Sequence, residues 1–173
     1  MGTVRVLLCF VCAVTFIGNG LPGSSVVKAD ARQRLLNVAR AEIGVREVGH
    51  NGGKRVAEYL ACTGIKVPAP YCAAFVSFVF WKAGYSAPRT PWSPALFPAS
   101  RVVEVGSAGE GLVFGIYFPE LKRIAHVGLV ESVKDDWVAT IEGNTNPEGS
   151  RDGQGVYRRM RHKRTIAKYA DWL

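Results

Sequence analysis

PAPYCAAFVSFVFWKAG, residues 68–84, is the stretch that decides the fold. Pro68 and Pro70 stop any preceding helix, because proline lacks a backbone N–H and clashes with the turn before it. Cys72 to Ala83 is then apolar on nearly every side, and Gly84 follows it. A helix that is apolar all round is a buried helix. The stretch therefore predicts a central helix with a cysteine at its N-terminus.

Two further helices are predicted upstream of this one. From Ala31 to Ile43 apolar residues recur at helical spacing, with Asp30 as the candidate N-cap and Gly44 as the residue that ends the helix. Gly53 to Thr63 repeats the pattern. All the predicted helices thus lie in the first half of the chain.

The second half is typical of β-strands. Residues 86–100 hold four prolines and predict an ordered loop. Short segments rich in Val, Ile, Tyr and Phe follow, separated by turn residues: Leu112–Phe118, Ile124–Val133, Trp137–Glu142 and Gly155–Arg161, with Ile166–Ala170 as a candidate closing strand. Helices first and strands afterwards indicate an α+β fold, with N-terminal helices packed on an antiparallel β-sheet or meander.

The N-terminus predicts export. Val6 to Ile17 is almost wholly apolar but too short to cross a bilayer, which needs about 20 residues. Small residues follow it, which is typical of a cleaved secretory signal. We expect residues 1–31 to be the signal and residues 32–173 to be one monomeric, exported (periplasmic or extracellular) domain without a stable membrane anchor. An uncleaved anchor is the alternative.

The charge favours an anionic partner. The chain has 22 Lys and Arg against 14 Asp and Glu, a net charge of +8. Without Arg5, Lys28 and Asp30 of the expected signal, 20 bases and 13 acids remain, a net charge of +7. For an exported bacterial protein the nearest large polyanion is the cell wall, and we expect the basic run Arg158–Arg164 to contact it. Nucleic acid is not expected, because this run has no interleaved aromatic side chains.

Four residues could carry acyl-transfer chemistry. A thiol nucleophile needs a base that takes its proton and a group that orients the base. Cys72 is the candidate nucleophile, since a helix N-terminus lowers a thiol pKa. His126 is the candidate base, although a buried histidine bonded to a backbone carbonyl is the alternative. With a turn near residues 135 and 136, Glu142 lies a short diagonal from His126 on the adjacent strand, and Asn144 follows it.

These residues resemble the CHAP family (cysteine, histidine-dependent amidohydrolases/peptidases) and its NlpC-like relatives. The similarity rests on four blocks that extend over most of the chain: IGVRE at residues 43–47, PYCAAFVS at 70–77, AHVG at 125–128 and IEGN at 141–144. It implies a papain-like fold, Cys72 as nucleophile, His126 as base, Glu142 as orienting acid and Asn144 as an auxiliary polar residue. It also implies cleavage of an amide bond of peptidoglycan through a thioester, by a stem-peptide endopeptidase or an N-acetylmuramoyl-L-alanine amidase.

Other residues are weaker candidates. Tyr71 stands where many relatives have tryptophan and could form the rim of the site. Glu47, Asn51 and Trp92 could line a substrate groove, although turn formation and packing are the alternative for each. Cys62 could pair with Cys72 in an oxidising compartment, but we expect both to be free. No cofactor or metal is expected, because no ligand set has metal spacing.

Two other functions remain open from the sequence. The domain could be a catalytically idle module that binds the wall through its basic surface. It could also be an acyl or peptidyl transferase with the same catalytic residues.

Overall fold

The computed structural model describes residues 24–147 and 153–173. Three α-helices come first along the chain: α1 (Ser24–Ala41), α2 (Lys54–Ala61) and α3 (Cys72–Lys82). Six strands follow: β1 (Val102–Val103), β2 (Val113–Phe118), β3 (Arg123–Lys134), β4 (Trp137–Thr145), β5 (Gly155–His162) and β6 (Lys168–Ala170). Four short 3₁₀-helices lie in the connections, the first between α3 and β1 and the others between strands: η1 (Ser93–Leu96), η2 (Val105–Ser107), η3 (Pro119–Leu121) and η4 (Lys163–Thr165).

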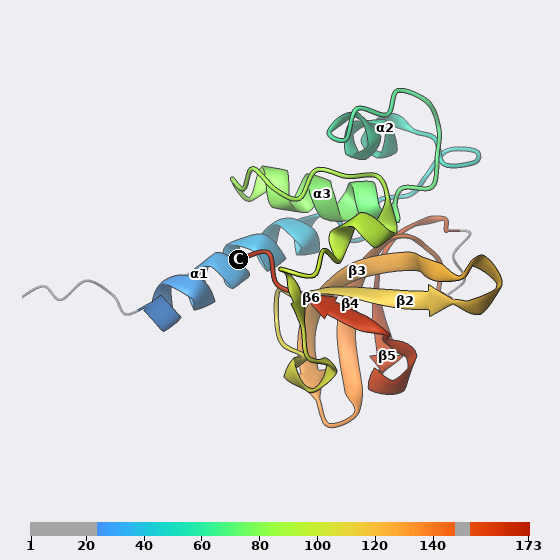
Figure 1. Ribbon diagram of the computed structural model, residues 1–173. Coiled ribbons are helices and arrows are strands. Elements are labelled where there is room, and N and C mark those ends of the chain that lie inside the picture. The colour runs from blue at the N-terminus through green and yellow to red at the C-terminus, as the bar shows by residue number, and fades with distance from the viewer. Residues whose placement is uncertain (1–23, 148–152) are drawn as a thin grey trace, which may run out of the picture.

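The strands form one antiparallel sheet in the order β1-β6-β2-β3-β4-β5. Strands β2 to β5 are successive neighbours, as the predicted meander requires, while β6 returns to pair with β2. The helices lie together against this sheet (Figure 1). The α+β class predicted from the sequence is therefore confirmed.

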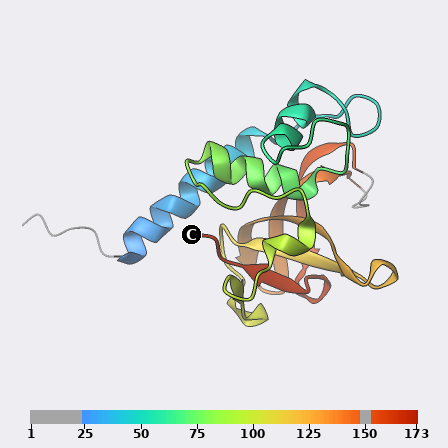
Figure 2. The same ribbon diagram turned by 45° about the horizontal axis from the view of Figure 1, so that its top comes forward.

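The central helix α3 connects the layers. Every residue from Cys72 to Phe80 is buried, which confirms the helix predicted to be apolar all round. It contacts α1 and α2 as well as β3 and β4, and Figure 2 shows it between the other helices and the sheet. Tyr59 of α2 packs edge-on against Phe75 and Phe78 of α3. The contacts of α3 with β3 and β4 hold it against the middle of the sheet.

The first helix differs from its predicted bounds. Its start lies upstream of Ala31, so Asp30 is not the N-cap but an interior residue that pairs with Arg34 four positions later. Lys28 and Arg32 bind Asp171 at 2.8 and 2.9 Å. These ion pairs connect α1 to the C-terminal segment, a long-range contact that local periodicity cannot indicate.

Other boundaries are close to prediction. Helix α2 is shorter than the predicted Gly53–Thr63, and Gly53 stands at its N-cap with a φ of 102°, a conformation that favours glycine. Strand β1 is an addition, because a two-residue strand leaves no alternating pattern in the sequence. Most of the expected signal segment lies outside the described residues, and residues 24–31 belong to α1. In the described part of the chain, no helix combines the length and apolarity that a bilayer crossing requires.

Candidate active site

Cys72 is the first residue of α3, and only 6% of it is exposed. Its Sγ lies 3.5 Å from the Oγ of Ser93, in the turn that begins η1. Burial opposes ionisation of the thiol, but the nearby His126 and Ser93 outweigh it and hold the pKa of Cys72 below its usual value. Ser93 has no motif around it, only a proline-rich loop, and sequence reasoning missed it.

His126 on β3 and Glu142 on β4 are joined directly. The Nε2–H of His126 donates to the Oε2 of Glu142 at 2.7 Å, and both residues are buried. The β3–β4 hairpin turns between Lys134 and Trp137, close to the turn predicted from the sequence. Since Nε2 is engaged by Glu142, Nδ1 is the ring nitrogen left for the thiol.

Two glycines allow these strands to approach their neighbours. A Cβ on Gly143 would lie 2.6 Å from the Cβ and Cγ of Phe75 on α3. A Cβ on Gly128 would lie 2.8 Å from the carbonyl oxygen of Ile141 and 3.0 Å from the Cγ of Glu142. The glycines that follow the histidine and the glutamate thus have a steric reason: a side chain at either position would force α3 and β4 away from the site.

Glu142 also binds Thr140 and Arg161. Arg161 on β5 donates from Nε to Oε1 at 2.8 Å and from Nη2 to Oε2 at 2.6 Å. Thr140 Oγ1 donates to Oε1 at 2.6 Å. Burial alone would raise the pKa of Glu142, but Arg161 and His126 lower it to about 2. The carboxylate is therefore an anion at neutral pH although it is fully buried.

The imidazole of His126 is held in its charged form. Burial lowers its pKa, but Cys72 and Glu142 outweigh burial and raise the pKa to about 9. Together with the lowered pKa of Cys72, this favours a thiolate–imidazolium pair near neutral pH. A thiolate beside an imidazolium can attack a carbonyl carbon and return a proton to the leaving group.

These pKa values predict the pH dependence of kcat/KM on a soluble substrate. The imidazolium persists below its raised pKa, so we expect activity to decline above about pH 9. The acidic limb should lie below the ordinary pKa of a thiol, because the pKa of Cys72 is lowered. The two groups titrate as a pair, so both limbs belong to the pair. A profile that still rises beyond pH 10, measured by initial rates in matched ionic strength, would contradict this arrangement.

The basic run on β5 differs from its predicted role. Arg161 is largely buried against Glu142, and Arg158 binds Glu131 at 2.9 Å through Nη2. The expectation that the whole run faces an anionic wall is therefore wrong for Arg161, whereas Arg158 keeps 54% of its side chain exposed and its contact with the wall stays a prediction. Within this run, Arg161 is the partner of Glu142, the candidate orienting acid. The only sequence signal for an inward-facing arginine here was the alternation of inward and outward residues in a half-buried strand.

Asn144 lies in a β-bulge of β4. The register of β4 with β5 shifts between Glu142 and Thr145, and Asn144 has a φ of 55°. Asparagine is one of the few residues besides glycine that adopt this left-handed conformation readily. Asn144 is buried, and its Oδ1 has no hydrogen-bond partner within the described residues. The conformation gives Asn144 a structural role, and its auxiliary role in chemistry stays a prediction.

Two substitutions separate these roles. We expect Asn144→Ala to destabilise the fold by about 1 kcal/mol relative to Asn144→Gly, because alanine is strained at positive φ. We expect Asn144→Gly to lose less turnover than Glu142→Gln. Thermal unfolding and steady-state kinetics of the three variants measure both effects. Equal stability of the alanine and glycine variants would contradict the backbone role.

Tyr71 and Glu47 lie on the α3 N-terminal side of the site. Tyr71 is fully buried, so it is not part of an exposed rim. Burial and the neighbouring charge of Glu47 raise the pKa of the Tyr71 hydroxyl. Neither the Tyr71 hydroxyl nor the Glu47 Oε2 has a hydrogen-bond partner with normal geometry within the described residues. Glu47 is thus close to the residue before the nucleophile, and a substrate contact by either residue stays a prediction.

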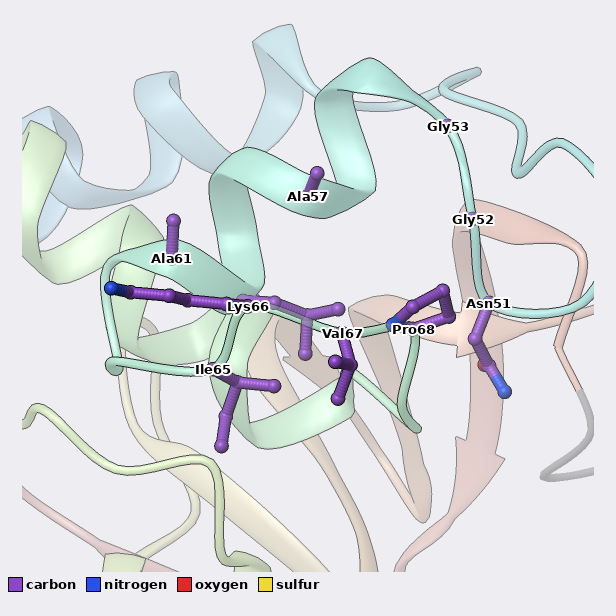
Figure 3. A pocket seen from close by; sticks show the side chains of 10 residues that line it. Asn51, Gly52, Gly53, Ala57, Ala61, Ile65, Lys66, Val67 and Pro68 are labelled. Carbon is purple, nitrogen blue, oxygen red and sulfur yellow. The ribbon is translucent and has the colours of Figure 1, made fainter.

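Asn51 lines a pocket to which Trp92 does not belong. This pocket of about 330 Å³ is formed by α2 and the loops before and after it, with Asn51 at one end and Lys66 at the opposite end (Figure 3). Neither Cys72 nor His126 belongs to that lining. Trp92 is 52% exposed, precedes Ser93 and stacks against the guanidinium of Arg123 at 4.2 Å. Of the two, Trp92 is the one connected to the nucleophile, through its neighbour in sequence.

The second cysteine of the described chain is separate from the site. Cys62 and Cys72 are both free, and the Sγ of Cys62 lies 3.0 Å from the carbonyl oxygen of Tyr59. Burial raises the pKa of Cys62 to about 11. Within residues 24–147 and 153–173, no cluster of three His, Cys, Asp or Glu side chains could hold a metal ion.

Solved structures share this architecture. The chain matches a mutated form of the resuscitation promoting factor interacting protein RipA with a TM-score of 0.55 and 16% identity, over 84% of this chain and 64% of that one. The protein therefore shares the α+β fold of this structure. It also matches the peptidoglycan hydrolase RipB from Mycobacterium tuberculosis, with a TM-score of 0.50 and 21% identity, over 88% of this chain and 71% of that one.

A third similar structure is the NlpC/p60 domain of the peptidoglycan hydrolase SagA, with a TM-score of 0.49 and 13% identity, over 81% of this chain and 97% of that one. Against the RipA structure described above, the chain spans less than two thirds of the length. No protein-family model and no curated protein matches the sequence. The fold resemblance predicted from the four sequence blocks is confirmed.

Proposed function

We propose that the protein is an exported cysteine hydrolase that cleaves an amide bond of peptidoglycan. The observation that carries the proposal is the buried bond between His126 and Glu142 beside a thiol whose pKa is lowered. The fold shared with RipB, which is described as a peptidoglycan hydrolase, supports the substrate class. The net charge of +7 that remains without residues 1–31 supports attraction to an anionic wall.

In the proposed acylation step, the Cys72 thiolate attacks the carbonyl carbon of the amide. The oxygen takes the negative charge, and the free backbone N–H groups at the start of α3 can bind it. His126 then gives its proton to the nitrogen as the C–N bond breaks. The amine leaves and a thioester on Cys72 remains.

In the proposed deacylation step, the now neutral His126 takes a proton from water. The hydroxide attacks the thioester carbon, the C–S bond breaks, and the carboxylic acid leaves. The thiolate and the imidazolium are restored. Glu142 stabilises the ring charge and selects the ring orientation in both steps, without itself being protonated.

We propose residues 1–31 as the secretory signal and residues 32–173 as the catalytic domain. In this arrangement the enzyme meets its substrate outside the cytoplasm. N-terminal sequencing of the secreted protein tests the boundary.

Mass spectrometry of purified muropeptides tests the reaction. We expect new products that gain the mass of one water, and their fragments identify the bond as a stem-peptide or a lactyl amide. Products joined to an added amine instead of water would favour a transferase. An intact substrate, together with retained sedimentation on insoluble wall, would favour a binding module and contradict the proposal.

A further inference from the structure

The Glu142 carboxylate is held by hydrogen bonds from three residues, His126, Thr140 and Arg161. Glu142 is fully buried, and each of its two oxygens accepts two hydrogen bonds. Arg161 is the only one of the three donor residues that reaches both oxygens. The oxygen that binds His126 is therefore also held by Arg161.

We propose that Arg161 is a positioning residue of this site: its guanidinium fixes the plane of the Glu142 carboxylate and, through it, the ring of His126 beside Cys72. The inference rests on the proposed function only in assigning that thiol a catalytic role. Arg161 lies opposite Val138 in the β4–β5 register, and its side chain reaches Glu142 from there. No contact between Arg161 and the thiol is required.

The paired N–H donors of the Arg161 guanidinium, here called the fork, explain why an arginine rather than a lysine stands at this position. A planar guanidinium with two parallel N–H donors matches a carboxylate, whereas an ammonium binds it as a point charge. Without the fork, the carboxylate keeps only the donors Thr140 and His126 and can turn about its last torsion. Arg161 has 14% of its side chain exposed, so water replaces the fork poorly.

Arg158 on the same strand provides a matched control. It also contacts both oxygens of a carboxylate, that of Glu131, through Nε and Nη2. Glu131 binds Arg40 as well, at 2.7 Å, and no histidine. The Arg158 side chain is 54% exposed. Arg158 and Arg161 thus share charge, strand and type of bond, but only Arg161 is connected to the histidine.

The test measures the alkylation of Cys72 by iodoacetamide between pH 5 and pH 10, followed by peptide mass spectrometry of the full chain. Thiolate alkylates and thiol does not, so the rate at each pH reports the thiolate at Cys72 without any substrate. Cys62, whose pKa is about 11, serves as the internal reference. We compare Arg161→Met, Arg161→Lys, Glu142→Gln, the Glu142→Gln/Arg161→Met double variant and Arg158→Met.

We expect Arg161→Met to raise the midpoint of the Cys72 alkylation profile by about one pH unit, which lowers the rate by about tenfold on the acidic limb of the profile. Arg161→Lys should recover less than half of the decrease in the logarithm of the alkylation rate, because lysine restores the charge but not the paired donors of the guanidinium. The double variant should match Glu142→Gln, and Arg158→Met should match the wild type.

Several results would overturn the proposal. These are wild-type alkylation in Arg161→Met, full recovery in Arg161→Lys, an equal loss in Arg158→Met, or a further loss when Arg161→Met is added to Glu142→Gln. Circular dichroism checks folding. If Arg161→Met fails to fold, Arg161→Lys against the wild type and the double variant against Glu142→Gln decide the question. Failure of wild-type protein to cut muropeptides would count against the proposed function and leave this alkylation result valid.

Discussion

We expect Cys72→Ala to abolish amide hydrolysis, a loss of at least about 10⁴ in turnover, because the nucleophile is gone and no covalent step remains. Cys72→Ser should lose nearly as much, since a hydroxyl ionises far less readily than a thiol. Helix α3 should form in both variants, because its remaining apolar residues still pack between the helices and the sheet. Steady-state kinetics on a soluble muropeptide measure the loss.

Cys62→Ser is the matched control for this change. Cys62 is also partly buried, but its thiol contacts backbone carbonyls of Tyr59 and Ala74 rather than a histidine. We expect this variant to keep most of the activity. The proposed nucleophile is wrong if both Cys72 variants digest wall at the wild-type rate, or if activity is lost in Cys62→Ser and kept in Cys72→Ala.

We expect Glu142→Gln to lower turnover by about 10 to 10³, with substrate affinity nearly unchanged. The amide can turn either its oxygen or its NH₂ to His126, so the ring loses its defined orientation and the imidazolium loses a neighbouring charge. A thiol depends less on its base than a serine hydroxyl does, which keeps the loss below that of a serine enzyme.

The same change should reduce the free energy of unfolding. It leaves the buried guanidinium of Arg161 without its anion, and breaking a buried ion pair from one side costs about 3 to 5 kcal/mol. The Glu142→Gln/Arg161→Met double variant removes both charges, and we expect it to be more stable than Glu142→Gln while keeping the same reduced turnover. Chemical denaturation and kinetics of the two variants test this. A double variant that is less stable than Glu142→Gln would contradict the ion-pair account.

The pH dependence of unfolding provides an independent measure of Glu142. Its pKa in the folded protein is about 2, below the ordinary value for a glutamate. Its ionisation therefore stabilises the fold above that ordinary value, and this contribution disappears as the pH falls toward 2. Glu142→Gln should lack this part of the acid dependence.

Local sequence was sufficient for most of the architecture. The apolar run after Pro70 predicted α3, because a helix that is buried on every side has apolar residues at nearly every position. Short segments rich in β-branched and aromatic residues predicted β2 to β5 with ends near those observed. The nucleophile, base and acid were named from residue type and position, and the structure places His126 and Glu142 in direct contact.

The register of the β3–β4 hairpin shows what the sequence left undecided. Lys134 opposes Trp137 at the turn, but Leu129 opposes Ile141 further along, because a bulge intervenes between Val130 and Ser132. Extending the register of the turn would place His126 opposite Thr145 and Glu142 on the other face. A shift by one residue exchanges the two faces of a strand. The bulge therefore makes the contact between the base and the acid possible.

The sequence by itself determined the order of helices and strands, the buried central helix and the chemical groups of the site, because local periodicity and residue type encode these. Only the tertiary structure decided that Arg161 binds Glu142, that Ser93 lies beside Cys72 and that α1 binds Asp171. Those contacts join residues far apart in the chain. They depend on strand register and on the packing of α3 against the sheet, and no local pattern records either.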